Sequence, residues 1–339
     1  MRLTECRDEL LAVMLVIADD ITGAADSAAA FTASGHRCVV SLDGLITRSD
    51  RPPDTIVVID TDSRDMHASD AFAVTSAAIS RHSPTELFIK IDSTLRGNIR
   101  ATVEATVSTL SALKREPDRI LICPAFPQLG RTVVNGRVHV HGVPLDGADL
   151  CELFDGLRTK GRVEIPDVQT DHDLAIAVGS ALGTTLWVGS AGLARHVGAS
   201  IAANDAALHD GETIAAARRP CSRVVVIAGS QHPSTLEQID ALNPSTNIAA
   251  LHPLDPQFSA RADQAARGAD GLVLTGGATA RIVLDLLEVR SLDVRGEVEP
   301  GIAWSTARSR SGDITVVTKA GGFGNTLALQ RAADFLSRS

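Results

Sequence analysis

Short apolar runs alternate with alanine-rich, amphipathic stretches along most of the chain. The run over residues 13–20 precedes the stretch 23–35, and the run 184–190 precedes the stretch 191–203. Apolar runs of this length are typical of buried strands, and the longer amphipathic stretches are typical of helices. Further strands are expected over 38–42, 55–60, 86–92 and 119–126, and a helix over 98–116. The alternation predicts an α/β fold with largely parallel sheets.

The 339 residues are enough for two domains, because a typical domain holds ~100–200 residues. Residues 203–221 are polar and rich in alanine, without the character of a strand, and the alternation starts again after them. We therefore expect two Rossmann-like domains. Their predicted bounds are 1–205 (with 1–12 as a disordered lead) and 221–339, joined by a linker over 206–220. Met14 is an alternative start.

Charge and composition exclude several classes of protein. The net charge is −9 and neither half is basic, which argues against a nucleic-acid partner. No run of ~18 apolar residues is present, so we expect no membrane span. The first residues carry acids ahead of an apolar run and lack the pattern of a signal peptide. The five cysteines form no CxxC pair, which predicts reduced thiols in the cytoplasm and gives no metal site.

Polar clusters directly follow two predicted strands of the first half, where ligands of open α/β sheets bind. Asp19 and Asp20 can take a proton from a hydroxyl, bind Mg²⁺ or hold sugar hydroxyls. The alternative is that Asp20 or Thr22 only caps the next helix. Arg64, in the sequence DTDSR, can clamp a carboxylate with its planar fork, or it can form an ion pair within the loop.

The segment KIDSTLRGN is the densest mixed polar cluster, and it also follows a predicted strand. Lys90, Ser93 and Arg96 lie ahead of a helix N-terminus, where backbone N–H groups favour an anion. Asp92 is a candidate base or metal ligand. A later proline- and glycine-containing segment, 124–145, is predicted as a rigid loop with Arg131 as its contact residue.

The second half contains three glycine turns, at Gly229-Ser230, at Thr275 to Thr279 and at Gly321 to Asn325. Each turn ends a predicted strand and opens a helix. Glycine allows a backbone to approach a ligand closely, so the set suits the phosphates and sugar of a nucleotide. None of the turns is a Walker A loop, because the chain contains no GK dipeptide. His232 is a further candidate for a nucleotide contact. The predicted nucleotide residues are Ser230, Gly276, Gly277, Ala278, Thr279, Lys319, Gly321, Gly322 and Gly324.

Taken together, the motifs resemble those of the four-carbon acid sugar kinase family. They are, in chain order, ADDITGAADSAAAF, DTDSR, KIDSTLRGN, PAFPQLGRTVVNG with HGVPL, VGSAGLA, TGGATA and TKAGGFGN. The resemblance runs from residue 18 to about residue 325. It implies ATP-dependent phosphorylation of the terminal hydroxyl of erythronate, threonate or 3-oxo-tetronate. It also implies an N-terminal acid-sugar domain and a C-terminal nucleotide domain, with the active site in the cleft between them.

The resemblance implies roles for individual residues. It places the nucleotide on Ser230, Gly276 to Thr279 and the glycines from Gly321. It places the acid sugar on Asp19, Asp20, Arg64, Lys90, Ile91, Asp92 and Ser93.

Phosphoryl transfer needs mainly positioning of the reactants and stabilisation of charge, and this requirement suggests a role for each residue. Arg64 and Lys90 would hold the substrate carboxylate, and Asp19, Asp20 or Asp92 would orient or deprotonate the hydroxyl. Lys319 and the glycine turns would hold the phosphates with Mg²⁺.

Two departures from the family pattern keep other functions open. Ala278 stands where the family usually has Asp, and the chain is short between HGVPL and VGSAGLA. The alternatives are a kinase of another small sugar acid, or a non-catalytic sensor of a sugar acid or nucleotide. A dehydrogenase is disfavoured, because no acid lies ~20 residues beyond a GxGxxG turn. The oligomeric state stays open, with a homodimer among the partners considered.

Overall fold

A computed structural model describes residues 14–46, 51–52, 54–157, 161–180, 183–204, 219–250 and 255–338. The predicted disordered lead lies outside these residues. Of the predicted linker over 206–220, only Arg219 and Pro220 are described. Both therefore stay predictions. No helix of the described residues is long and apolar enough to cross a bilayer.

The first half contains strands that alternate with helices and a group of short strands between β5 and β9. Its elements are β1 (Leu15–Ala18), α1 (Ile21–Thr32), β2 (Cys38–Ser41), β3 (Ile56–Asp60), α2 (Ala68–His82), β4 (Leu87–Lys90), α3 (Ile99–Ala112), β5 (Arg119–Cys123), the 3-10 helix η2 (Pro127–Leu129), β6 (Arg131–Val134), β7 (Arg137–Val140), β8 (Val143–Asp149), α4 (Leu150–Leu153), β9 (Arg162–Glu164), α5 (Asp171–Gly179), β10 (Thr185–Gly189) and α6 (Ala191–Asn204).

The second half repeats the alternation and adds two long antiparallel strands. Its elements are β11 (Val224–Ala228), α7 (Pro233–Asp240), β12 (Ile248–Ala250), α8 (Phe258–Ala266), β13 (Gly271–Thr275), α9 (Gly277–Leu286), β14 (Ser291–Glu299), β15 (Ile302–Ser309), β16 (Gly312–Lys319) and α10 (Ala328–Ser337).

The main sheet has 13 strands in the order β12-β11-β13-β16-β15-β14-β2-β3-β1-β4-β10-β5-β9. Its pairs are parallel except where β14 and β15 take part. The fold is therefore α/β with largely parallel strands, as predicted. The strands at its centre, such as β1 and β3, are buried along their whole length, which explains their continuous apolar sequences.

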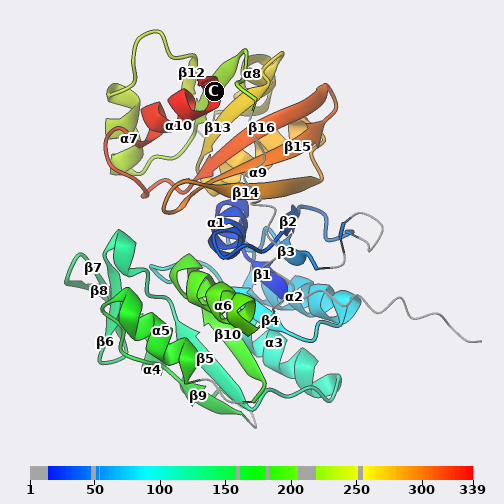
Figure 1. Ribbon diagram of the computed structural model, residues 1–339, viewed down its shortest axis with the longest axis vertical. Helices are drawn as coiled ribbons and strands as arrows, with labels where there is room; N and C mark the ends of the chain where they lie inside the picture. Colours follow the sequence, from blue (N-terminus) through cyan, green and yellow to red (C-terminus); the bar gives the residue numbers. More distant parts are fainter. Residues whose placement is uncertain are drawn as a thin grey trace, which may run out of the picture.

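The two halves of the chain meet along this sheet and around α1. In Figure 1 the first half, from blue to green, lies below the second half, from yellow to red, with α1 between them. β14 of the second half pairs antiparallel with β2 of the first, with Leu292 opposite Val40. The same sheet thus runs through both halves.

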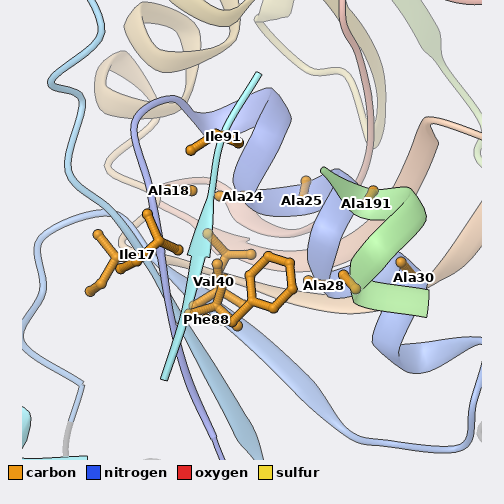
Figure 2. Packing of buried hydrophobic residues seen from close by; sticks show 14 of the residues in the cluster. Ile17, Ala18, Ala24, Ala25, Ala28, Ala30, Val40, Phe88, Ile91 and Ala191 are labelled. Atoms are coloured by element: carbon orange, nitrogen blue, oxygen red, sulfur yellow. The ribbon is translucent and has the colours of Figure 1, made fainter. Parts of the chain in front are cut away.

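Helix α1 is buried on every side. All of its residues are buried, and Figure 2 shows Ala24, Ala25 and Ala28 packed among strands and the start of α6 at Ala191. A helix without a polar face fits only where neighbours cover it all round. Small side chains let these neighbours approach closely. The helix begins two residues before the predicted 23–35 stretch, because Asp20 caps it.

Two predictions from the sequence need correction or completion. Residues 124–145, expected as a rigid loop, contain η2 and contribute to a separate three-stranded antiparallel sheet, β6-β7-β8. Glycines in left-handed turns, including Gly130 and Gly136, connect these short strands. No element was predicted over 291–309, where the structure has the β14-β15 pair.

Candidate active site

The predicted acid-sugar residues gather at the carboxyl ends of three neighbouring strands. In the sheet, Ala18 at the end of β1 lies opposite Asp60 of β3 on one side and Lys90 of β4 on the other. The polar segments that follow these strands therefore leave the sheet side by side. This placement confirms that the clusters follow strands and come together, as parallel pairing requires.

Asp19 and Arg64 form a two-pronged ion pair. Arg64 donates from Nε to Asp19 Oδ2 at 2.9 Å and from Nη2 to Asp19 Oδ1 at 2.6 Å. Burial raises the pKa of Asp19 above its ordinary value despite the lowering effect of Arg64. Because the fork of Arg64 is occupied, the predicted clamp on a substrate carboxylate does not fit this geometry. The alternative of an ion pair fits better, although its partner Asp19 follows β1 and does not belong to the loop of Arg64.

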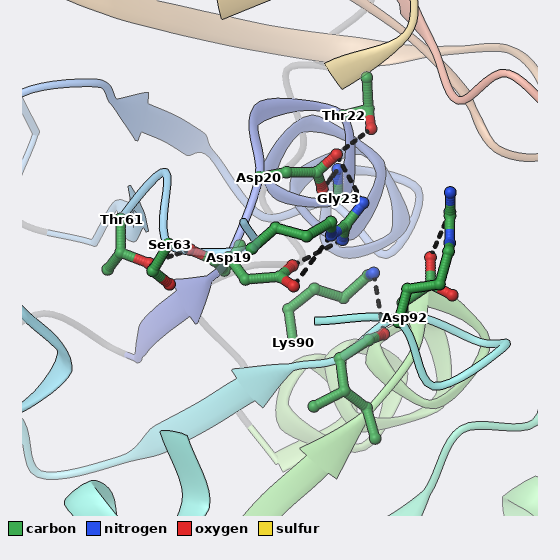
Figure 3. Close-up of polar contacts among 12 residues, drawn as sticks. Asp19, Asp20, Thr22, Gly23, Thr61, Ser63, Lys90 and Asp92 are labelled. Carbon is green, nitrogen blue, oxygen red and sulfur yellow. Dashed lines mark hydrogen bonds and ion pairs between the residues drawn. The ribbon is translucent and has the colours of Figure 1, made fainter. Parts of the chain in front are cut away.

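Asp20 caps α1, which is one of the two functions that the sequence left open, and its second function stays a prediction. Its Oδ1 accepts from the backbone N–H of Gly23 at 2.8 Å, so it caps α1, and its Oδ2 accepts from Thr22 Oγ1 at 2.6 Å. Arg64 Nη1 lies 2.8 Å from Oδ2 (Figure 3). The carboxylate also lines both cavities described below. Helix capping and ligand binding are thus compatible at this residue.

The segment after β4 fixes the loop that carries Arg64. Asn98 Nδ2 donates to the carbonyl oxygens of Ser63 at 3.0 Å and Met66 at 2.8 Å. Gly97 has a φ of +92°, and a Cβ there would lie 2.5 Å from Asp19 Oδ2. Only glycine meets both demands without strain. The Gly-Asn pair of KIDSTLRGN therefore supports the Asp19–Arg64 pair.

Lys90 and Ser93 face the site from the end of β4. Lys90 is buried and its Nζ donates to the carbonyl of Ile91 at 3.0 Å (Figure 3). Since an ammonium group has three N–H donors, others remain for a ligand. Ser93 is buried and lines the same cavity as Lys90. Ile91 lines neither cavity and packs in the hydrophobic core.

Asp92 is held in its ionised form. Burial raises its pKa, but the hydrogen bond and charge of Arg96, at 2.6 Å from Oδ2, outweigh burial and hold the pKa well below its usual range. Thr94 also donates to Oδ1 through its backbone N–H. A carboxylate so stabilised is a poor proton acceptor, so Asp92 is better suited to orient Arg96 or bind a cation.

The three glycine turns of the second half come together at the carboxyl ends of β11, β13 and β16, which are neighbours in the sheet. A Cβ at Gly321 would lie 2.0 Å from Ser230 Oγ, and one at Gly277 would lie 2.4 Å from Asp20 Oδ2. The N-terminus of α9 therefore meets the N-terminus of α1 directly. Glycine at these positions allows the contact that brings the two predicted sites together.

Two predicted contact residues act through neighbouring groups. Lys319 Nζ donates to the carbonyl oxygens of Ala320, Gly321 and Phe323 at 2.9, 3.1 and 3.0 Å. Because these three bonds all go to the glycine turn, Lys319 positions the turn. Its side chain lines neither cavity. Arg131 also lines neither cavity, and its guanidinium lies 5.3 Å from the ring centre of Phe323.

Two cavities that share part of their lining lie between these groups. The larger, of about 230 Å³, is lined by the three glycine turns and His232. The smaller, of about 20 Å³, is lined by residues that include Lys90, Asp92 and Ser93. Asp20, Thr22, Arg64, Arg96 and Ala320 line both. Of the remaining predicted residues, Asp19 and Gly324 line neither.

The sequence analysis did not select several residues of the smaller cavity. Gly23 and Asp26 come from α1, Ser190 from the end of β10, and Phe126 and Phe323 from loops of the two halves. Gly23 and Asp26 lie within the ADDITGAAD motif, three and six residues after Asp20, so this spacing was a usable signal. The two phenylalanines lie within the PAFPQLGR and TKAGGFGN motifs, but nothing in these motifs indicated that their rings reach the site.

Two family models and several known proteins match this chain. The family model described as a sugar-binding N-terminal domain matches residues 14–152, and the one described as a nucleotide-binding C-terminal domain matches residues 257–329. A D-threonate kinase of Cupriavidus necator is 28% identical over 420 aligned positions, covering 96% of this chain and 98% of that protein. Because 420 exceeds 339, the relative has segments that this chain lacks, as the short spacing predicted.

A 3-oxo-tetronate kinase of Methylobacterium radiotolerans is 22% identical and covers 95% of this chain and 98% of its own. A crystal structure from Salmonella typhimurium, described as that of a tRNA synthase, superimposes with a TM-score of 0.72. It is 20% identical and covers 95% of this chain and 99% of its own, so it supports the fold alone. The relatives named as kinases establish a phosphotransferase, and the chain belongs to the four-carbon acid sugar kinase family.

Proposed function

We propose that the protein transfers the γ-phosphoryl group of ATP to the terminal hydroxyl of a four-carbon sugar acid, with D-threonate as the first substrate to test. The main support is the direct junction of the two predicted sites. Asp20 lines both cavities, and Gly277 lies so close to it that a Cβ would be 2.4 Å from its Oδ2. The full-length relative named a D-threonate kinase supports the choice of substrate.

The larger cavity fits a nucleotide. Its glycine turns leave free the space that Cβ atoms would fill, and the N-terminus of α9 presents backbone N–H groups and partial positive charge to a phosphate. Thr279 Oγ1 is buried without a hydrogen-bond partner among the described residues. Bound ATP supplies the phosphoryl group, and the turns at Ser230, Gly276 and Gly321 would hold it.

Mg²⁺ would bind with the nucleotide. The described residues contain no group of three or more His, Cys, Asp or Glu side chains arranged to hold a metal. Mg²⁺ in kinases is usually held by one or two carboxylates together with substrate phosphates, so a dense cluster is not required. Asp92, which is held in its ionised form and lines the smaller cavity, would serve this purpose and leaves Asp20 to act on the hydroxyl.

The acid sugar would bind at the smaller cavity. Its volume of about 20 Å³ has room for only about one water molecule, so the two halves would have to move apart to admit the substrate. The ammonium group of Lys90 would bind the carboxylate of the acid sugar, and the hydroxyl of Ser93 would be a second donor to it. Asp20 would orient the hydroxyl that attacks and take its proton. Arg96, which lines both cavities, would stabilise charge on the transferred group. Asp19 and Arg64 would hold Asp20 in place rather than contact the substrate.

The division into residues 1–205 and 221–339 is part of this proposal. Residues of both halves line each cavity, so closure of the halves over the substrates would exclude water. The homodimer also stays a prediction.

The direct test is ATP-dependent release of ADP with Mg²⁺ across D- and L-threonate, D- and L-erythronate and their 3-oxo forms. We expect turnover with at least one of them and no ADP release without acid. Thermal shift with ATP alone serves as the control for nucleotide binding. Silence across the panel with ATP binding intact would exclude these substrates and indicate another sugar acid. Silence without ATP binding would contradict the whole proposal and favour the sensor that Ala278 suggested.

A further inference from the structure

The buried carboxyl of Asp26 is not used by the proposed chemistry. Asp26 lies on α1, is 5% exposed, and lines the smaller cavity. Its Oδ1 has no hydrogen-bond partner among the described residues. Buried polar groups are nearly always hydrogen-bonded, so an orphaned carboxyl oxygen in a cavity wall indicates a partner that comes from outside the chain.

The position of Asp26 fits one end of a bound acid sugar. Asp20, Gly23 and Asp26 follow one another at a spacing of three, which places neighbours on one side of the helix. A Cβ at Gly23 would lie 2.7 Å from Asp20 Oδ1 and 3.2 Å from Lys90 Nζ. Glycine thus leaves open the space between Asp20 and Lys90, in the wall of the cavity that Asp26 also lines. Asp26 lies about 9 Å along the helix axis from Asp20.

The positive charges near Asp26 do not offset the cost of burying its carboxylate. Burial raises its pKa to about 7 against the lowering effect of Lys90. Arg195 of α6 is already paired with Glu297 of β14, with 2.5 Å between Nη2 and Oε2. The protein therefore retains an acid whose ionised form it destabilises, a pattern typical of functional sites.

We infer that Asp26 binds the hydroxyl next to the carboxylate of the acid sugar and thereby reads the configuration of that carbon. The inference rests on the proposed function. The substrate carboxylate lies at Lys90 in this proposal, and a second acid would repel it, whereas a hydroxyl can donate to Oδ1. The carbon beside the carboxylate is one of the two stereocentres whose configurations distinguish threonate from erythronate, so Asp26 determines substrate choice.

The test compares Asp26→Asn with the wild type and with Ser27→Ala. Asn keeps the shape of the side chain but replaces an acceptor oxygen by a donor. Ser27 is the adjacent buried residue on α1, lines neither cavity, and bonds only to helix carbonyls. The steady-state constants are measured for each tetronate and for ATP, with the thermal midpoint of each variant.

For Asp26→Asn we expect the KM for the preferred acid sugar to rise at least about tenfold. The KM for ATP should stay within about twofold, and the preference for one diastereomer should weaken. The thermal midpoint should not fall, because the amide avoids burial of a charge. Ser27→Ala should keep the wild-type preference.

Two outcomes would overturn the inference. If Asp26→Asn keeps the KM and the preference of the wild type, Asp26 does not contact substrate. If it lowers the thermal midpoint and raises the KM for ATP and acid sugar alike, Asp26 has a structural role only. If instead the wild type turns over none of the tetronates, the proposed function falls and this inference falls with it. The two failures are therefore distinguishable.

Discussion

The carboxylate of Asp20 connects the start of a helix with the junction of two cavities. It accepts a hydrogen bond from the Gly23 N–H and forms an ion pair with Arg64. It also lies where a Cβ at Gly277 would be 2.4 Å from its Oδ2. A substitution at Asp20 can therefore disturb folding, chemistry or both. Asn is the substitution that separates them, because it caps helices about as well as Asp but carries no charge and is no base.

We predict that Asp20→Asn lowers kcat by about 10²- to 10⁴-fold with little loss of stability. The measurement is steady-state turnover together with chemical denaturation. Thr170→Ala is the matched control, since Thr170 caps α5 through a capping box outside both cavities. That variant should lose about 1 kcal/mol of stability and keep its turnover. Near-normal turnover in Asp20→Asn would contradict its role.

Asp26 predicts a pH dependence of stability. The pKa of an unfolded Asp is about 3.9, and burial raises the pKa of Asp26 to about 7 against Lys90 of β4 and Arg195 of α6, with Glu297 of β14 and Asp20 adding to the rise. Between these values the unfolded chain releases a proton that the folded chain keeps, so stability falls as pH rises. The Asp26→Asn variant has no carboxyl to titrate at this position, so this fall in stability with pH is absent from it.

We expect the free energy of unfolding of Asp26→Asn to exceed that of the wild type by an amount that grows from about pH 4 to pH 7. The growth is at most about 1.4 kcal/mol per pH unit, and the difference is constant at higher pH. Urea denaturation of both proteins at several pH values measures it. A difference that does not change with pH would show that Asp26 is not a buried titrating group.

At the scale of elements, the N-terminus of α9 is the contact on which the site depends. Gly277 begins α9, and its lack of a side chain admits the carboxylate of Asp20. A methyl group there would displace the Asp20 carboxylate from its hydrogen bonds to Thr22 and Gly23, or shift α9 relative to α1. Since both cavities extend to Asp20, the shift affects nucleotide and acid sugar together.

We predict that Gly277→Ala lowers kcat/KM for both substrates by at least about a hundredfold, because small displacements of reacting groups have effects of this size. Gly179→Ala is the control: Gly179 ends α5, and a Cβ there has nothing within 4 Å. It should keep the wild-type activity. Equal activity of the two variants would show that the contact between α9 and Asp20 tolerates a methyl group.

The sequence predicted the parallel strands and the polar residues that follow them, because each such unit has a local pattern. Strand β4 and the segment after it are an example, since an apolar run ends in Lys90 and KIDSTLRGN. The β14-β15 pair was missed, because it has no continuous apolar run and no following helix, although the alternation in SLDVRGEVE is itself the pattern of a half-buried strand. The burial of Asp26 depends on neighbours from distant segments and leaves no local signal.

For the whole molecule, the halves are also joined by a buried ion pair. Arg281 of α9 lies 3.0 Å from Asp60 at the end of β3, and the Asp60 side chain has no exposed area. Burial raises the pKa of Asp60 to about 7 in spite of the backbone N–H of Asp62 and the charge of Arg281. Removing Arg281 leaves this carboxyl without its cation.

We predict that Arg281→Met lowers the free energy of unfolding by about 3 kcal/mol at pH 8, where Asp60 is ionised. The loss should be smaller at pH 5, where the carboxyl is protonated. Adding Asp60→Asn should restore part of the loss at pH 8, which a double-mutant cycle measures. Independent, additive effects of the two substitutions would show that this pair does not hold the halves together.

The pairing of β2 with β14 has a consequence for synthesis of the chain. Its partners, such as Val40 and Leu292, lie about 250 residues apart in sequence. Until the ribosome has made β14, the nascent first half carries β2 as an edge strand with unpaired backbone groups. Exposed edges invite pairing with other chains. The sheet that unites the finished protein is thus the part of it that most needs protection from aggregation while translation continues.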